Sequence, residues 1–446
     1  MRTGVLHAAF ALLMQTGINP TAHANPLDLF GFGARAQGLG GAYTAQADDF
    51  SANYYNPAGL SAKEGLRLEL GYAYHQPMMR INDADVGIDA SRGLQGGVVV
   101  CAPLWDQKFA ASVGLYLPDG VVSRIRALPE NQPRFVMVDN RPQRLVITTS
   151  LALEIYPDLY LGGGVTFLAN TRGDVDIRGD VAFFDADNTE LRSALDVELN
   201  SVRYPTVGIS YRPGSHWRFG LTWREEFNLK MDLNVRVAGD IVNDENTDER
   251  EVVVADASFL MNALNSNLFS PRQLALGMAY QRPYWHVAMD VVWMQWSRFK
   301  APTATLDFNL DLGGLPFEIP PQPAPGDPAF TDIVLLRMGG EVRALEGTWG
   351  ALDVRLGYGL EPSPVPEQRG VTNYIDDTKH TFSLGLGLRL RDLKPVMEKG
   401  LNIDVSVQGI WLPSFNVYKD DPADLIGNYS ANGFSLGGTL TASMLF

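Results

Sequence analysis

Long apolar runs, cysteine and basic residues are all scarce in this sequence, and each shortage excludes a class of protein. No stretch approaches the roughly 18 consecutive apolar residues of a transmembrane helix, so a helical membrane protein is excluded. The single cysteine, Cys101, rules out an internal disulfide. The 36 Lys and Arg against 51 Asp and Glu leave a formal net charge of −15. This balance argues against nucleic acid as a partner, because phosphate binding requires clustered Lys and Arg.

Residue patterns typical of catalysis are also missing. The six histidines are scattered, and the sequence contains no His/Cys metal-ligand spacing, no phosphate-binding loop and no nucleophile elbow. We therefore expect a protein that is not an enzyme and that binds no metal and no cofactor.

The first 24 residues have the three parts of an export signal. Arg2 supplies a basic start, Val5 to Met14 form a short apolar stretch, and Ala22-His23-Ala24 fits the small-x-small cleavage pattern. We expect residues 1–24 to be a signal peptide, so that the mature chain starts near Asn25.

From residue 66 to the C-terminus, large apolar residues alternate with small or polar ones. The clearest example runs from Thr381 to Leu390, where Phe382 and every second residue after it is large and apolar. Such alternation predicts a strand with one apolar face. Many strands of this kind average to neutral hydropathy, which is typical of a membrane-spanning β-barrel.

The repeated pattern predicts about 14 strands, each long enough to cross the hydrocarbon layer at a tilt. The connections between them alternate in length, with short turns on one side and long loops on the other. The long loops are predicted at 77–92, 118–142, 171–199, 228–270, 297–331, 362–378 and 413–430. Aromatic residues near these boundaries, such as Tyr156, Trp285 and Trp296, fit the headgroup layer. We therefore predict an all-β fold, a transmembrane antiparallel β-barrel over residues 66–446.

Residues 25–65 break this alternation. The segment is rich in small residues and is too irregular to face lipid. Irregular backbone at membrane depth must be buried in protein or line a water-filled cavity. We therefore expect residues 25–65 to plug the barrel from inside, and we call this segment the hatch.

Several stretches of the chain resemble one known family. They are Gly38-Leu-Gly-Gly-Ala-Tyr43, Ala47-Asp48-Asp49, Asn56-Pro57-Ala58, Pro118, Pro271 to Phe299 and Leu356 to Pro366. In combination they are similar to the FadL/TodX family of outer-membrane transporters for long-chain fatty acids and aromatic hydrocarbons. The resemblance covers most of the mature chain.

The resemblance implies how such a barrel would work. Ligand is captured in an apolar groove between extracellular loops, binds inside the barrel beside the hatch, and leaves sideways at a kink in the third strand. Carried over to this sequence, Asn56, Pro57 and Ala58 form the hatch element that lies against the kink. The kink falls between Gly114 and Pro118, where Gly and Pro also weaken strand pairing on physical grounds.

Two groups of apolar residues are candidate ligand contacts. Phe30 and Phe32 belong to the hatch. The run from Asp256 to Phe269 opens with an N-cap-like Asp and continues with helical spacing, which predicts an extracellular helix. Such a helix would either line a ligand groove or pack under its neighbouring loop. Its candidate residues are Phe259, Leu260, Leu264 and Leu268.

Arginines on the lumen side, Arg337 and Arg355 among them, could hold a fatty-acid carboxylate through paired hydrogen bonds. The other interpretation is that they pair with lumen acids and hold plug and wall together. Similarly, an acidic run from Asp240 to Glu251 is either a solvated loop or a site for divalent cations that bridge lipopolysaccharide.

These features predict a channel for uptake of a hydrophobic small molecule, a long-chain fatty acid or a hydrocarbon. We expect it in the outer membrane of a Gram-negative bacterium, as a monomer in contact with lipid and lipopolysaccharide. Two alternatives stay open at this point, a structural or adhesive outer-membrane barrel and a hydrophilic porin.

Overall fold

A computed structural model of the chain describes residues 26–104, 107–119, 132–138, 144–182, 190–243, 251–299, 304–311, 327–391 and 400–446. The expected signal peptide (1–24), Asn25 and the acidic residues Asp244, Glu245, Asp248 and Glu249 lie outside the described residues. Among the described helices, none is both long and apolar enough to cross a membrane.

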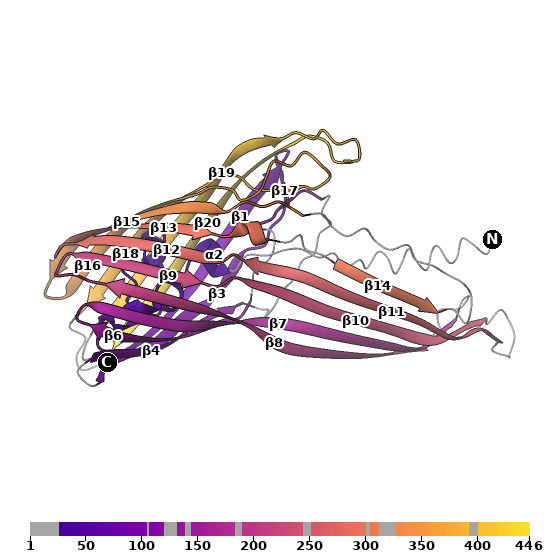
Figure 1. Ribbon diagram of the computed structural model, residues 1–446, viewed down its shortest axis with the longest axis horizontal. Coiled ribbons are helices and arrows are strands. Elements are labelled where there is room, and N and C mark those ends of the chain that lie inside the picture. The colour runs from indigo at the N-terminus through magenta and orange to yellow at the C-terminus, as the bar shows by residue number, and fades with distance from the viewer. Residues whose placement is uncertain are drawn as a thin grey trace.

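Antiparallel strands close into a 14-stranded barrel, as the alternation predicted (Figure 1). Its first strand, β1 (Gly65–Ile81), pairs with its last, β20 (Tyr429–Leu445), and thereby closes the ring. The other wall strands are β3 (Ser91–Leu104), β4 (Gln107–Pro118), β6 (Val146–Tyr156), β7 (Leu159–Ala182), β8 (Glu190–Tyr211), β9 (Trp217–Arg224), β12 (Gln273–Gln281), β13 (Trp285–Met294), β15 (Ile333–Gly347), β16 (Gly350–Glu361), β18 (Lys379–Leu390) and β19 (Leu401–Val417).

The two faces of the wall differ as a lipid-embedded barrel requires. On β1, Leu68 and Leu70 are 45% and 63% exposed on the outside, whereas Arg67 and Glu69, which alternate with them, are each 5% exposed on the inside. An apolar exterior with a polar interior is stable in lipid. Next to the short turns, Tyr156 and Trp285 are exposed, which fits an interfacial position. Trp296 is instead buried, so its predicted place in the headgroup layer is wrong.

Part of the chain extends beyond the barrel as a sheet (Figure 1). The outer ends of β7 and β8 are joined there by β10 (Phe227–Asn243), β11 (Glu251–Ser270) and β14 (Ala304–Asp311). β10 pairs with β7 in parallel and with β11 antiparallel, and β14 pairs with β11. The predicted long loops at 171–199 and 228–270 are therefore largely strands.

The helix predicted from Asp256 to Phe269 is wrong. Phe259, Leu260, Leu264 and Leu268 all lie on strand β11, which pairs with β10 on one side and with β14 on the other. An isolated helix of this length is marginal in water, so backbone bonds offered by two neighbouring strands decide the conformation. The side chains of these four residues lie outside the description, and their role in ligand capture stays a prediction.

The hatch lies inside the barrel and is built from very short elements. They are α2 (Pro26–Phe30), α3 (Ala34–Gly38), α4 (Ala52–Tyr55) and the 3-10 helix η1 (Pro57–Ala62). Phe32, Leu39, Phe50 and Leu60 are at most 1% exposed and form a core with inward residues of the wall. The hatch therefore packs as part of the folded protein.

Candidate functional site

The hatch touches the wall backbone directly because the wall presents glycines to it. Seven wall strands carry an inward glycine at which an added Cβ would lie 2.0 to 3.0 Å from its nearest neighbour. In each case that neighbour, or one within 0.1 Å of the same distance, is a hatch atom. Real Cβ atoms do not approach so closely, so any larger residue would displace hatch or wall. The seven glycines are Gly162, Gly208, Gly220, Gly277, Gly339, Gly357 and Gly385.

We call the surface formed by these seven glycines the seat of the hatch. Asn56, Pro57 and Ala58 occupy one part of it. Asn56 caps η1 by accepting a hydrogen bond from the Ala58 N–H at 3.2 Å. Its amide nitrogen donates to the carbonyl oxygens of Thr44 (2.9 Å) and Ile209 (3.0 Å). The segment lies against the glycines of β7 and β8. The resemblance had placed it against the third wall strand, which is β4.

Gly114 on β4 faces a different part of the hatch. A Cβ at Gly114 would lie 2.5 Å from Thr148 Oγ1, 3.2 Å from Asn53 Nδ2 and 3.4 Å from Phe32 Cε1. Asn53 also donates a hydrogen bond to Ser112 Oγ of the same strand at 2.7 Å. At Gly114 the nearest hatch side chains are therefore Asn53 and Phe32, while the 3-10 helix η1, which begins at Pro57, also contacts β4.

Strand pairing continues through the region between Gly114 and Pro118, and the kink expected there stays a prediction. β4 pairs residue for residue with β3 from Gln107 to Pro118 and with β6 from Phe109 to Tyr116. The neighbouring strands β3 and β6 both pair with β4 at Gly114, and their hydrogen bonds hold the strand from both sides at this glycine. Pro118 is the last residue of β4, where the missing amide proton costs little.

The outer face of the wall carries a shallow apolar groove behind Gly114. Its volume is about 610 Å³, and it runs across β3, β4, β6 and β7. Small residues, Ala111, Thr149 and Gly163, make the hollow, while valines and Leu151 border it. Because Gly114 has no side chain and Val113 beside it points outward, the wall here is little more than backbone between hatch and lipid face.

On the outer side of the hatch, two adjoining cavities of about 40 Å³ each share Leu29, Phe30, Glu361 and Thr381. Phe30 stacks on His75 with ring centroids 4.3 Å apart. Phe32 does not line either cavity; it packs edge-on against Phe50 instead. Pockets for small molecules usually measure some 300 to 1,000 Å³, so these cavities must widen before a ligand fits.

Arg337 on β15 lines the first of these cavities together with Phe30 and two tyrosines. Its side chain passes over Gly41 of the hatch, where a Cβ would lie 3.1 Å from Arg337 Cδ. Within the described part of the chain, no carboxylate pairs directly with Arg337, although the buried Asp290 stands opposite it in the strand register. It is therefore a partly buried cation that can receive an anion.

The second cavity also has a cation, Lys379, but that one is already paired. Its Nζ lies 2.9 Å from Asp376 and 3.2 Å from Glu361. Burial raises the pKa of the Asp376 carboxyl, and the Lys379 ammonium opposes this shift. Lys379 is thus held by two carboxylates, unlike Arg337.

The position of Arg355 does not fit the role of a ligand contact. It is buried on the opposite side of the hatch and pairs with Glu341 at 2.6 Å and with Asp404 at 2.5 Å. For this arginine the structure agrees with the second interpretation of the sequence, a pairing with lumen acids.

The outer mouth of the barrel holds an aromatic cluster that the sequence did not reveal. Phe299 and Phe330 stack with centroids 4.2 Å apart, and the remaining members are Phe269, Trp296 and Tyr374. Over it, β5 (Arg134–Phe135) pairs with β17 (Tyr374–Ile375). These residues come from four separate segments, so only the fold brings them together. In the sequence, the signal for this cluster is the number of aromatic residues in or next to the long loops.

Comparison with known proteins shows which family this chain matches and which solved structures it resembles. Residues 29–443 match the family described as outer membrane protein transport protein (OMPP1/FadL/TodX). Among solved structures, a Pseudomonas aeruginosa FadL homologue aligns with a TM-score of 0.56 at 15% identity, covering 92% of this chain and 97% of that one. The Pseudomonas putida toluene transporter TodX aligns with a TM-score of 0.53 at 15% identity, covering 94% and 99%.

The CymD monoaromatic hydrocarbon channel aligns with a TM-score of 0.54 at 13% identity, covering 94% of this chain and 98% of that one. No curated protein matches the sequence. At such low identity the structures establish the shared fold, while the family match covers nearly the whole chain. The chain belongs to the FadL/TodX family of outer-membrane transporters of hydrophobic compounds.

Proposed function

We propose that this chain takes up a hydrophobic small molecule and releases it sideways into the membrane through the wall at β4. The observation that supports this most is the arrangement around Gly114. Phe32 and Asn53 of the hatch lie on its inner side, and the apolar groove lies on the outer face of the same strands. Hatch side chains and an outward apolar groove therefore lie on the two sides of the same part of the wall.

The route begins at the outer mouth. The aromatic cluster around Phe299 and Phe330 is buried, so it receives a ligand only after its side chains have moved apart. The next station is the pair of cavities beside Phe30. A ligand that binds better to a widened cavity than to the narrow one shifts the protein toward the wider state.

Exit requires that Phe32 and Asn53 move away from Gly114. Their hold on the wall is modest, because it consists of one hydrogen bond to Ser112 and contacts between neutral groups. The groove outside then receives the ligand among small and apolar residues. A ligand does not fit between strands that stay hydrogen bonded, so pairs of β4 with a neighbouring strand near Gly114 must also separate during passage.

The ligand we favour is a long-chain fatty acid. Arg337 is a cation without an ion-pair partner among the described residues, and it lines a cavity with Phe30. A carboxylate accepts paired hydrogen bonds from a guanidinium, whereas a neutral hydrocarbon gains nothing from it. A hydrophilic porin would need an open lumen, and the hatch packed against the wall glycines argues against one.

Two measurements test the proposal. Organic extracts of protein purified from outer membranes should contain a fatty acid by mass spectrometry. Cells that lack this chain should take up labelled long-chain fatty acid more slowly than complemented cells. Equal uptake in the two strains would overturn the proposal. A co-purified hydrocarbon would overturn the preference for a carboxylate ligand.

A further inference from the structure

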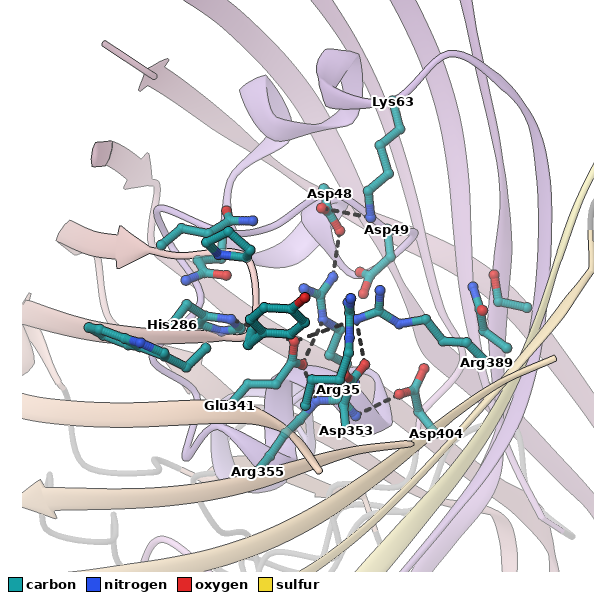
Figure 2. A pocket seen from close by; sticks show the side chains of 18 of the residues that line it. Arg35, Asp48, Asp49, Lys63, His286, Glu341, Asp353, Arg355, Arg389 and Asp404 are labelled. Atoms are coloured by element: carbon teal, nitrogen blue, oxygen red, sulfur yellow. Dashed lines mark hydrogen bonds and ion pairs between the residues drawn. The ribbon is translucent and has the colours of Figure 1, made fainter. Parts of the chain in front are cut away.

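A charged cavity of about 290 Å³ lies between the hatch and the end of the barrel that carries the short turns (Figure 2). Residues 281–285, the turn between β12 and β13, form part of its rim. Most of its lining is ionic and comes from both the hatch and the wall. An apolar ligand gains nothing from entering such a cavity, so the uptake route has no use for it.

On the hatch side, the charges converge on Asp48. Arg35 NH1 and Lys63 Nζ each lie 2.8 Å from a different oxygen of this carboxylate. Arg67 of the wall also donates to the Asp48 carbonyl oxygen. Asp48 is buried, so its charge depends on these cations.

On the wall side, the charges converge on Glu341 of β15. Glu341 stands opposite Arg355 of β16 and opposite His286 of β13 in the strand register. Its carboxylate lies 2.6 Å from Arg355 Nε, 3.5 Å from His286 Nδ1 and 3.7 Å from Arg389 NH2. Glu341 is 6% exposed.

One residue joins the two groups. Arg35 of the hatch lies 3.7 Å from Glu341 through its Nε, while its NH1 holds Asp48. Figure 2 shows Arg35 between these two carboxylates. Because Arg355 and Arg389 stand close by, Glu341 offsets their repulsion of Arg35 on the wall side.

We propose that Glu341 is a positioning residue that anchors Arg35 and thereby keeps the inner end of the barrel closed to water-soluble solutes. The protein then admits apolar compounds without the leak of a porin. The anchor suits this task because it is ionic. Apolar ligands in transit do not compete for it, whereas separating a buried carboxylate from its cations is costly because it leaves an uncompensated charge.

The test compares variants that differ in which pair they break. Arg35→Met removes the hatch partner, and Glu341→Gln removes the wall partner. Arg343→Met is the matched control, because Arg343 lines the same cavity but pairs only with wall residues, Asp353 and Glu346, each at 3.3 Å. Arg35→Lys keeps the charge at the hatch position.

The readouts are ion conductance in planar bilayers and sugar-driven swelling of liposomes. We expect Arg35→Met and Glu341→Gln to raise the time spent conducting by about tenfold, a shift that loss of one anchoring pair can produce. Arg343→Met and Arg35→Lys should stay within about twofold of the wild type. Migration of unheated protein on SDS gels verifies that each barrel is folded.

Two results would overturn the inference. In one, folded Arg35→Met and Glu341→Gln proteins stay as tight as the wild type. In the other, Arg343→Met leaks as much as they do, which would mean that any lost charge loosens the wall. The inference takes from the proposed function only that the hatch stays in the barrel. Failure of the wild-type protein to take up fatty acid would therefore count against that function and not against the anchor, because leak is measured without ligand.

Discussion

Asp290 of β13 accepts a hydrogen bond from the backbone N–H of Thr44 in the hatch, at 2.9 Å. The same carboxylate oxygen accepts a second bond from the N–H of Tyr43 at 3.0 Å. Asp290 is completely buried, and Gly277, its partner in the strand register, leaves room for the hatch backbone. The wall thus holds the hatch here by a buried carboxylate as well as by close packing.

Replacing Asp290 should therefore loosen the hatch. Hydrogen bonds to a charged acceptor contribute about 1.5 to 3 kcal/mol each, and Asp290→Ala loses two. Asp290→Asn keeps one acceptor oxygen and should lose less. The measurement is the temperature at which the barrel unfolds in detergent, together with protease cleavage within residues 26–62. An Asp290→Ala protein as stable and as resistant as the wild type would show that the two bonds do not matter.

Gly162 and Gly163 of β7 offer a matched pair on opposite faces of one strand. A Cβ at Gly162 would lie 2.3 Å from Ala58 N, so Gly162→Ala must push Asn56-Pro57-Ala58 from its seat. A Cβ at Gly163 would meet nothing nearer than 3.9 Å. We expect Gly162→Ala to lower the unfolding temperature and Gly163→Ala to leave it unchanged. Equal effects of the two substitutions would show that strand propensity, and not the seat, is responsible.

Arg337 should discriminate between kinds of ligand. Arg337→Met is expected to reduce fatty-acid uptake by about tenfold or more, since a hydrogen-bonded charge is lost. Uptake of a neutral aromatic hydrocarbon should change little. Arg337→Lys should retain part of the fatty-acid uptake, because it keeps the charge without the paired geometry. A parallel loss for both ligands would assign Arg337 a structural role.

The wall strands could be predicted from the sequence because lipid on one side imposes a period of two on every strand. β11 could not be predicted in this way, because its apolar residues fit both periods over a short run. β10 could have been found, since Leu229, Met231, Leu233 and Val235 alternate with polar residues as regularly as any wall strand.

The seat of the hatch illustrates a different limit. The glycines that form it are visible in the sequence, but the sequence does not show that they all contact the hatch. That depends on strand register, which places Gly162 opposite Gly208 and Gly339 opposite Gly357. Arg337 and Arg355 likewise appear equivalent in sequence. They differ because Glu341 and Asp404 pair directly with Arg355, whereas Asp290, which stands opposite Arg337, binds the hatch backbone.

The most direct test of sideways release fills the groove in the outer wall. Gly163 lies in this groove, and Gly340 lies in a second outward groove of about 570 Å³ on the wall formed by β12, β13, β15 and β16. Both glycines can carry a tryptophan that points into lipid. We predict that Gly163→Trp slows the uptake of labelled fatty acid by cells while Gly340→Trp leaves it unchanged. Wild-type uptake by correctly folded Gly163→Trp protein would contradict release through this wall.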